Sequence, residues 1–562
     1  MIKRWYPAMT AFAACLVCYL AGWRGTDWAA QIYRAGQVAA HGLSLWDPGW
    51  YAGMFPLGYS LVYPVLAGYL GLWPVAVGSA VASSYCFDAL VQRGRGQPRP
   101  ISSWYFAFST VVEVAIGQLP TLAAEALGLG CVLCLTRYWG GSRVPGAWRT
   151  ALLGGGIGLG LLAGLTSPVA GIFVALSLGA WGLSIATDAE RALFDRQGLA
   201  LIALAFAVVA ATIALPLLFA APGFFPFLSG DLVAVLGICT ALAGPWLRAA
   251  RPIRFAAVLY ALASVVFFFV PTTMGDNDTR FAAYVGVPLV IYYLPGALQR
   301  LGTAETRRRF GTALGGVVTV IFVGWNWAPM VNALGAAPNG AFSRSAFYRP
   351  LIDELNSLSR GLPVRVEIPP TEHHWESAYV APYFPLARGW ERQLDIAYDP
   401  LFYETGALGA GTYRHWLLGE GVSYVALANA PLDYASTAEA ALLKSGTVPG
   451  LVKVWRTQSW TVWKVQGSPG LASGAARVSS FVKAQVQLRF SRAGKVLLRV
   501  RWSDLWSLLA APAGRACLAP GPDGWTTVSA AHRGTVALGI AAIGANHGQC
   551  GRFVLAGSQR SG

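Results

Sequence analysis

Apolar runs long enough to cross a lipid bilayer recur along the chain, from its N-terminal end to about residue 330. A membrane-spanning helix needs roughly 20 mainly apolar residues. Hydrophobic residues make up 55% of the 562-residue chain and charged residues 12%, with a mean hydropathy of +0.49. That charged share is about half of what soluble globular proteins carry. The sequence therefore predicts a polytopic α-helical membrane protein with a more polar C-terminal part.

The lengths of these runs predict about eleven transmembrane helices. The expected spans lie at about 7–22, 57–82, 101–119, 121–137, 150–165, 167–186, 198–220, 232–247, 255–271, 281–298 and 311–330. Under this count every strongly basic loop falls on the same side, and Lys/Arg-rich loops normally stay cytoplasmic. The basic residues that set this orientation include Lys3, Arg4, Arg93, Arg95, Arg99, Arg143 and Arg191. The pattern predicts a multi-pass protein of the cytoplasmic membrane, with a cytoplasmic N-terminus and an extracytoplasmic C-terminal region.

The sequence divides into a transmembrane domain over 1–335, an extracytoplasmic mixed α/β domain over 336–466 and a small β-rich domain over 477–562. Alternating apolar residues predict strands in the two soluble domains. These strands are expected at 364–368, 422–427, 451–456, 460–465, 486–490 and 496–500. The Gly-, Ser- and Ala-rich stretch 467–476 reads as a linker. The last domain is expected to be a small β-sandwich.

Eight cysteines are present, and six of them lie in or beside apolar spans, where they read as small apolar residues rather than metal ligands. Cys517 and Cys550 are the two cysteines of the tail. They could form a disulfide if the tail is outside the cell, because disulfides persist in oxidising compartments.

The net charge of +16 and the pI of about 9.6 do not point to nucleic acid. The positive charge is dispersed through short loops, whereas nucleic-acid binding proteins concentrate it on one face. In a membrane protein, such an excess faces the anionic lipids of the cytoplasmic leaflet. The predicted partners are therefore membrane lipids and not nucleic acid.

The loop after the first apolar run is the most promising place for chemistry. Asp27, Gln31 and Arg34 are spaced i, i+4 and i+7, so they share one face if the stretch is helical. A carboxylate, an amide and a guanidinium would then point into one cavity at the membrane surface. We interpret that cavity as an active site.

This loop resembles that of the GT-C class of membrane glycosyltransferases: an acidic residue follows span one, and Trp46-Asp47-Pro48-x-Trp50-x-x-Gly53 comes next. Together with Phe55-Pro56-Leu57-Gly58-Tyr59, this segment resembles an uncharacterised bacterial GT-C-like family that is named for relatedness to a pterin synthase. The resemblance covers about 1–330. The tail is similar, more loosely, to periplasmic domains of actinobacterial cell-envelope glycosyltransferases.

The resemblance implies an enzyme that takes a sugar from a polyprenyl-phosphate donor and passes it to a glycan or glycolipid hydroxyl at the outer face. Asp27 would be the general base. Arg34 is the first candidate for binding the departing phosphate and Arg280 the second. Asp47 would orient the acceptor or a partner arginine. The remaining candidate substrate-binding residues are Gln31, Trp46, Trp50, Gln118 and Glu125, with Glu113 as a further acid inside span three.

Each of these residues also has a simpler interpretation. Asp27 could be only a helix N-cap, Arg34 could lie among lipid headgroups, and Trp46 and Trp50 could belong to an interfacial aromatic belt. No cofactor is predicted outright. Asp276 and Asp278 could hold a divalent cation, but an ordinary Asx-rich turn explains them as well.

A stretch of the tail, 372–392, is dense in aromatic and charged residues. Such a composition suits the binding of a polar ring face, although a folded core with exposed charges explains most of it. His373 and His374 are adjacent rather than at helical i, i+4 spacing, so a zinc protease site is not expected. Two other functions stay open for the whole chain: a transporter or flippase, and a non-catalytic assembly protein for envelope polysaccharide.

Overall fold

The computed structural model describes residues 5–92, 100–140, 145–188, 195–219, 221–300, 305–335, 340–482, 485–511, 516–540, 548 and 550. These residues form two compact units. The first comprises Met1–Gln31 and Leu57–Asn339, and the second comprises Ile32–Pro56 and Gly340–Gly562. The predicted transmembrane domain, 1–335, contains Ile32–Pro56, which the structure instead groups with the second unit.

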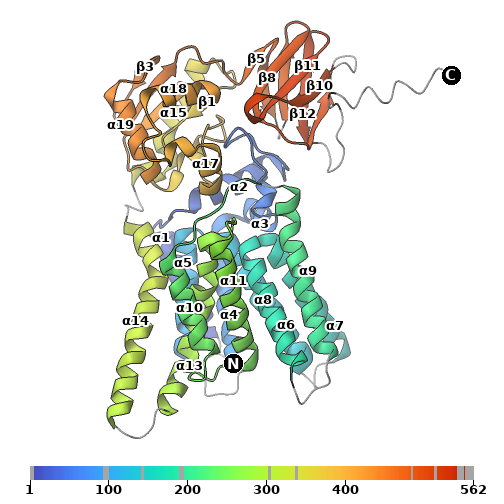
Figure 1. The fold of residues 1–562 in the computed structure, drawn as a ribbon, viewed down its shortest axis with the longest axis vertical. Helices are drawn as coiled ribbons and strands as arrows, with labels where there is room; N and C mark the ends of the chain where they lie inside the picture. The colour runs from blue at the N-terminus through green and yellow to red at the C-terminus, as the bar shows by residue number, and fades with distance from the viewer. Residues whose placement is uncertain are drawn as a thin grey trace, which may run out of the picture. The chain divides into compact units, whose positions relative to one another are not determined.

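The first unit is a bundle of helices that run side by side (Figure 1). They are α1 (Tyr6–Leu20), α3 (Val62–Leu70), α4 (Leu72–Val91), α5 (Pro100–Ile116), α6 (Leu119–Gly140), α7 (Gly146–Thr166), α8 (Pro168–Ala186), α9 (Arg196–Leu218), α10 (Ser229–Ala243), α11 (Arg251–Phe269), α12 (Thr279–Phe281), α13 (Val287–Arg300) and α14 (Glu305–Gly335). Six helices within the described residues are long and apolar enough to cross a membrane. The chain is thus a multi-pass membrane protein.

Helices occur at each of the eleven expected spans, but among the described residues only those six meet the length and apolarity of a span, and the number eleven stays a prediction. Orientation stays a prediction as well. Several of the basic residues that set the expected orientation, Lys3, Arg4, Arg93, Arg95, Arg99, Arg143 and Arg191, lie outside the described residues.

Two of the expected spans are interrupted. The single span expected at 57–82 is two helices, α3 and α4, because Gly71 between them has a φ of +91° that L side chains rarely adopt. The span expected at 281–298 begins as the short helix α12, passes through a π-helical turn, Ala282–Gly286, and only then becomes α13. Such π-turns occur often at functional sites.

Close contacts between glycines and a neighbouring helix hold part of the bundle together. A Cβ built on Gly164 of α7 would lie 2.6 Å from the Thr212 Oγ1, and one built on Gly171 of α8 would lie 2.3 Å from the same atom. Small residues let membrane helices approach this closely. This packing agrees with the Gly-rich composition of α7 and α8.

The second unit contains a four-stranded sheet in the order β1-β2-β4-β3, visible together with its helices in Figure 1. Its strands are β1 (Arg365–Glu367), β2 (Val422–Ala428), β3 (Leu451–Arg456) and β4 (Trp460–Val465). β1 and β2 are parallel and the other pairs antiparallel. The helices around it are α15 (Ser345–Ser359), α16 (Glu376–Tyr379), α17 (Arg392–Tyr398), α18 (Ala410–Gly419) and α19 (Thr437–Ser445). The expected β3–β4 hairpin and the expected mixed α/β character are confirmed.

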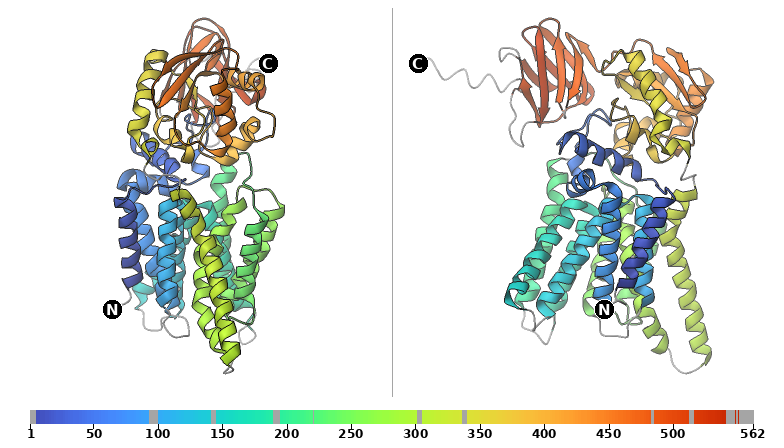
Figure 2. Two further views of the ribbon diagram at one scale, coloured as in Figure 1. Left: turned by 90° about the vertical axis from the view of Figure 1, so that its left-hand side faces the viewer. Right: turned by 180° about the vertical axis from the view of Figure 1, so that it is seen from behind.

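The C-terminal strands form a β-sandwich, as expected, from two four-stranded antiparallel sheets (Figure 2). One sheet has the order β10-β11-β8-β5 and the other β6-β7-β12-β9. The strands are β5 (Ala472–Gly474), β6 (Ala476–Val482), β7 (Gln485–Phe490), β8 (Gly494–Arg501), β9 (Trp506–Ala510), β10 (Ala516–Pro520), β11 (Trp525–Ala530) and β12 (Gly534–Ile540). The prediction of a linker over 467–476 is wrong for its second half, because β5 in that half pairs with β8.

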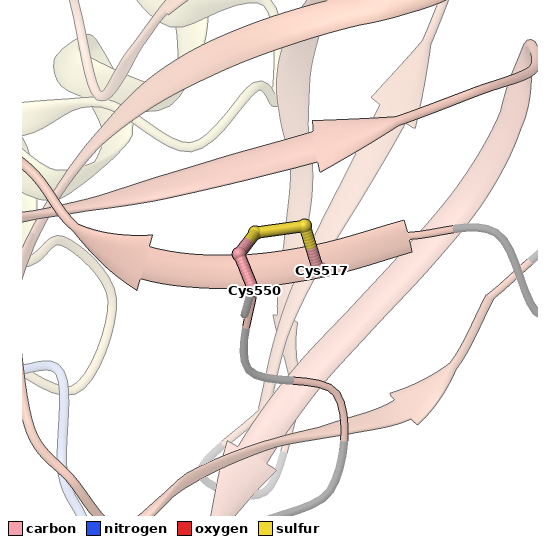
Figure 3. The surroundings of a disulfide bond; sticks show 2 residues. All are labelled: Cys517 and Cys550. Carbon is pink, nitrogen blue, oxygen red and sulfur yellow. A yellow bond between two sulfur atoms is a disulfide. The ribbon is translucent and has the colours of Figure 1, made fainter. Parts of the chain in front are cut away.

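Cys517 and Cys550 form a disulfide, shown in Figure 3. Cys517 lies on β10, and the backbone of Cys550 pairs with the same strand, since its N–H donates to the Leu518 carbonyl at 2.8 Å. The disulfide that the sequence left open is therefore present, and it attaches Cys550 to the sandwich.

Residues 32–56 pack into the second unit. α2 (Trp28–His41) leads into the segment, and Asp47 and Met54 then pair as an antiparallel bridge. Trp46 is 2% exposed and belongs to the sandwich core, where its ring meets that of Trp506 edge-on at 4.9 Å. Trp50 is fully buried, and its indole N–H donates to the Ser377 carbonyl at 3.2 Å. The interpretation of these two tryptophans as an interfacial belt is therefore wrong.

Candidate functional site

Asp27 lies in the first unit, where backbone contacts fix its position against the end of α5. The N–H of Gly25 donates to the Ala115 carbonyl at 2.8 Å, and the N–H of Asp27 donates to the Ile116 carbonyl at 2.9 Å. The Asp27 carbonyl accepts the first backbone bond of α2, from the Gln31 N–H. Its side chain accepts a hydrogen bond from the Thr26 hydroxyl at 3.1 Å. Asp27 therefore lies immediately before α2, and its position depends on α5 as well.

The turn between α5 and α6 meets the π-helical turn that precedes α13. Tyr284, on that turn, donates its hydroxyl to the Gln118 amide oxygen at 2.9 Å. Arg280, at the start of the same region, donates to the Thr121 hydroxyl at 2.9 Å. Residues more than 150 positions apart in the chain therefore share one polar cluster.

Tyr284 lies within electrostatic reach of several ionisable groups. Its phenol is acted on electrostatically by Glu113, Arg280, Asp27 and Glu125. Of the candidate residues, Asp27, Gln118, Glu125 and Arg280 thus lie near one another at one end of the bundle. Tyr284 and Thr121 were not singled out from the sequence. For Tyr284, the available signal was a polar group just inside the apolar run that follows the Gly275–Arg280 turn.

A small cavity of about 90 Å³ opens beside this cluster. Glu125, Arg280 and Tyr284 contribute to its wall, together with Thr121 and Ser177. The rest of the wall is formed by residues of α6, α8 and the 280–285 region, most of them apolar: Gly128, Leu129, Val132, Ala170, Phe173, Val174, Phe281 and Val285. The cavity therefore has a mostly apolar wall with charged and hydroxyl groups on one part of it.

Glu113 and Gln31 are buried polar residues of the same unit. Both carboxylate oxygens of Glu113 lack a hydrogen-bond partner within the described part of the chain, although the side chain is fully buried. An acid inside a membrane bundle is usually functional. Gln31 is 1% exposed and donates to the Tyr59 hydroxyl at 3.5 Å. These two side chains add polar groups to the helical bundle.

Arg34 belongs to the second unit and is 3% exposed. Its guanidinium donates to the Glu391 carboxylate and lies over the rings of Trp50 and Trp390, at 5.6 and 5.7 Å from their centres. The interpretation of Arg34 as a lipid-headgroup residue is therefore wrong. The structure gives it an ion-pair partner that the sequence did not suggest.

Asp47 is buried in the second unit as well. Its Oδ1 accepts hydrogen bonds from the Tyr33 hydroxyl at 2.6 Å and from the Gly49 N–H at 2.7 Å. Burial raises the pKa of Asp47, and the hydrogen bond from Tyr33 opposes that shift. By accepting these two hydrogen bonds, the Asp47 carboxylate stabilises the conformation of the 32–56 segment.

The Gly275–Asp278 turn does not form an obvious metal site. Burial raises the pKa of Asp276 to about 7, with a further contribution from Asp231, and burial also raises the pKa of Asp278 to about 7. No group of three His, Cys, Asp or Glu residues that could hold a metal ion occurs in the described part of the chain.

The aromatic and charged stretch 372–392 is largely a buried ion-pair network. Arg388 donates to both carboxylate oxygens of Asp395, at 3.0 and 2.6 Å, and to Glu439 at 3.2 Å. Arg392 pairs with Asp433 at 2.6 Å. Burial raises the pKa of the Asp433 carboxyl, but the hydrogen bonds from His374 and Arg392 outweigh that effect and hold the pKa well below its usual range. The network agrees with a folded core, but the expectation that its charges are exposed is wrong, because Arg388, Asp395 and Glu439 are buried and paired.

Comparison with known proteins gives few matches. No protein-family model and no curated protein matches the chain, so the resemblance to the family named for a pterin synthase stays a prediction. Solved structures that are similar include two cryo-EM classes of a mutant of the arabinofuranosyltransferase AftD from mycobacteria. Both are 15% identical, with TM-scores of 0.46 and 0.45. Each alignment covers 82% of this chain but only 41% of AftD.

Proposed function

We propose that this protein is a membrane glycosyltransferase of the GT-C type, which moves a sugar from a polyprenyl-phosphate donor to a cell-envelope glycan or lipid acceptor. The observation that carries the proposal is the cluster of Asp27, Gln118, Arg280 and Tyr284 at one end of a helical membrane bundle, beside a mostly apolar cavity. The motif resemblance of the first outer loop supports the same chemistry.

Asp27 is the proposed general base. The acceptor hydroxyl oxygen attacks the anomeric carbon, and its proton passes to the Asp27 carboxylate. The bond between the anomeric carbon and the phosphate oxygen breaks, and its electron pair leaves with the phosphate. A phosphate departs without a strong acid, so one base and one cation are sufficient for this step.

Arg280 is the proposed phosphate ligand. It lines the cavity, and its guanidinium already donates to Thr121, which leaves further N–H groups for a phosphate oxygen. A fixed cation beside the departing phosphate stabilises the charge that develops in the transition state. Arg34 is engaged by Glu391, so we assign the phosphate to Arg280 instead.

The test is Asp27→Asn in the full-length protein, assayed for sugar transfer from a panel of polyprenyl-phosphate sugars. Transfer should fall by about 100-fold or more, the usual contribution of a general base. The matched control is Asp188→Asn. Asp188 follows the C-terminal end of α8 and pairs with Arg251 near the surface. This variant should keep wild-type transfer.

Unchanged transfer in Asp27→Asn would reject Asp27 as the base. The two alternative functions, a transporter and a non-catalytic assembly protein, would give different results in the same experiment. Sugar-lipid flux across liposomes by wild type and Asp27→Asn alike, without transfer by either, would indicate a transporter. Glycan binding without turnover by the wild type would indicate an assembly protein.

A further inference from the structure

The second unit contains a cavity of about 600 Å³ that is separate from the polar cluster of the helical bundle. Three parts of the chain line it: residues within 33–49, residues within 356–385 of the α/β region, and Ser479, Ser480, Phe481, Gln485 and Ile540 of the sandwich. Its volume lies within the roughly 300–1,000 Å³ typical of small-molecule sites. A cavity built from three such distant segments exists only in the folded unit.

The wall of this cavity combines aromatic rings with uncharged hydrogen-bonding groups. The polar side chains include Gln37, Asn356, Ser480 and Gln485. No lysine or arginine is found among its described lining residues, and the one carboxylate there, Asp47, already accepts bonds from Tyr33 and Gly49. His41 is the one basic side chain among the described lining residues, so the wall has no cluster of cations of the kind that binds phosphates. It suits a neutral ligand with many hydroxyl groups.

Part of the wall is held rigidly. The Tyr33 ring stacks on Trp50 with their centres 4.6 Å apart, and its hydroxyl is anchored on Asp47. Trp46 is fixed against Trp506 in the sandwich core. A rigid wall lowers the cost of ordering side chains when a ligand binds.

Tyr383 is the most accessible aromatic side chain of the cavity. It is 65% exposed, and nearby lining residues Leu43 and Leu362 also expose apolar surface, at 52% and 45%. An exposed aromatic face beside neutral hydrogen-bonding groups matches a sugar ring, which has an apolar C–H face and a rim of hydroxyls.

We propose that this cavity binds an uncharged oligosaccharide, with Tyr383 as the stacking platform. Its use as the acceptor site rests on the proposed function, whereas the binding itself does not. Binding here would keep a growing glycan on the protein between transfer steps.

The experiment measures binding of neutral gluco-, galacto-, manno- and arabino-oligosaccharides of two to six residues to the full-length protein in lipid nanodiscs, by saturation-transfer NMR. At least one class should bind, and Tyr383→Ala should weaken it about tenfold, as the loss of one aromatic stacking contact predicts. Tyr434→Ala is the matched control, because Tyr434 is a tyrosine of the same unit with 68% exposure and does not line the cavity. It should bind as the wild type does.

Asn356→Ala provides a second variant on a different wall and should also weaken binding. Oligogalacturonate, an anionic probe, should not compete. The proposal is overturned if no neutral probe binds, if Tyr383→Ala and Tyr434→Ala bind equally, or if oligogalacturonate competes fully. Asp27→Asn should bind the probe normally, so a failure of the catalytic proposal is distinguishable from a failure of this one.

Discussion

Arg34 shows how far the surroundings of a residue can differ from its place in the sequence. Next to an apolar span and on a helix with Gln31, it has the position of a phosphate ligand. In the fold its partner is Glu391, 357 positions away in the chain, and the two side chains are 2% and 9% exposed. No local pattern identifies a partner at that separation.

We predict that Arg34→Leu destabilises the second unit by about 3–5 kcal/mol, because it leaves the buried Glu391 carboxylate without its cation. The double variant Arg34→Leu/Glu391→Leu should recover most of that loss, since removing both charges also removes the cost of burying them. Denaturant unfolding of the purified protein, followed by tryptophan fluorescence, measures both values.

Arg489→Leu is the control for this pair, because Arg489 is exposed on β7. It should change the free energy of unfolding by less than about 0.5 kcal/mol. A double variant as unstable as Arg34→Leu alone would show that Glu391 is not the group left unpaired.

At the scale of elements, the Asp27 loop depends on the turn after α5. Gly117 has a φ of +100°, and a Cβ there would lie 2.6 Å from the Trp28 backbone nitrogen and 2.9 Å from the Asp27 carbonyl carbon. The loop and the turn can approach this closely only because residue 117 has no side chain. The position of the proposed base is therefore a property of two elements together.

We predict that Gly117→Ala reduces sugar transfer at least tenfold, because the added methyl group pushes the Asp27 backbone away from α5. The strained φ should add a loss of stability of order 1–3 kcal/mol. Transfer assays and thermal unfolding measure the two effects. Gly154→Ala on α7 is the control, since a Cβ there meets no atom within 4 Å, and it should leave both unchanged or raise stability slightly. Wild-type transfer by Gly117→Ala would contradict this role for the turn.

The elements themselves differed in how well the sequence predicted them. The hairpin of β3 and β4 was predicted because apolar and polar residues alternate on both sides of a short turn. The break at Gly71 and the π-turn at Ala282–Gly286 were not, because an unbroken apolar run contains no periodic signal for either. β5 was missed because three small residues pair only through their neighbour β8.

At the scale of the whole molecule, the Cys517–Cys550 disulfide allows a test of the predicted orientation. In a variant that retains only these two cysteines, we predict that a membrane-impermeant maleimide labels neither of them in intact cells until a reductant is added. After reduction both should be labelled, because disulfides form outside the cytoplasm. Labelling that requires permeabilised cells would place the tail inside and contradict the orientation.

The sequence by itself determined that the first part of the chain is helical and suited to a membrane, because an apolar segment in lipid must satisfy its backbone hydrogen bonds within the helix. It also determined most strands of the tail and drew attention to Asp27, Gln118, Glu125 and Arg280, the polar residues next to apolar runs. Only the tertiary structure decided that residues 32–56 pack with the second unit, and that Tyr284 joins the cluster near Asp27. Those contacts join residues far apart in the chain, where side-chain packing selects the partner and local periodicity carries no information.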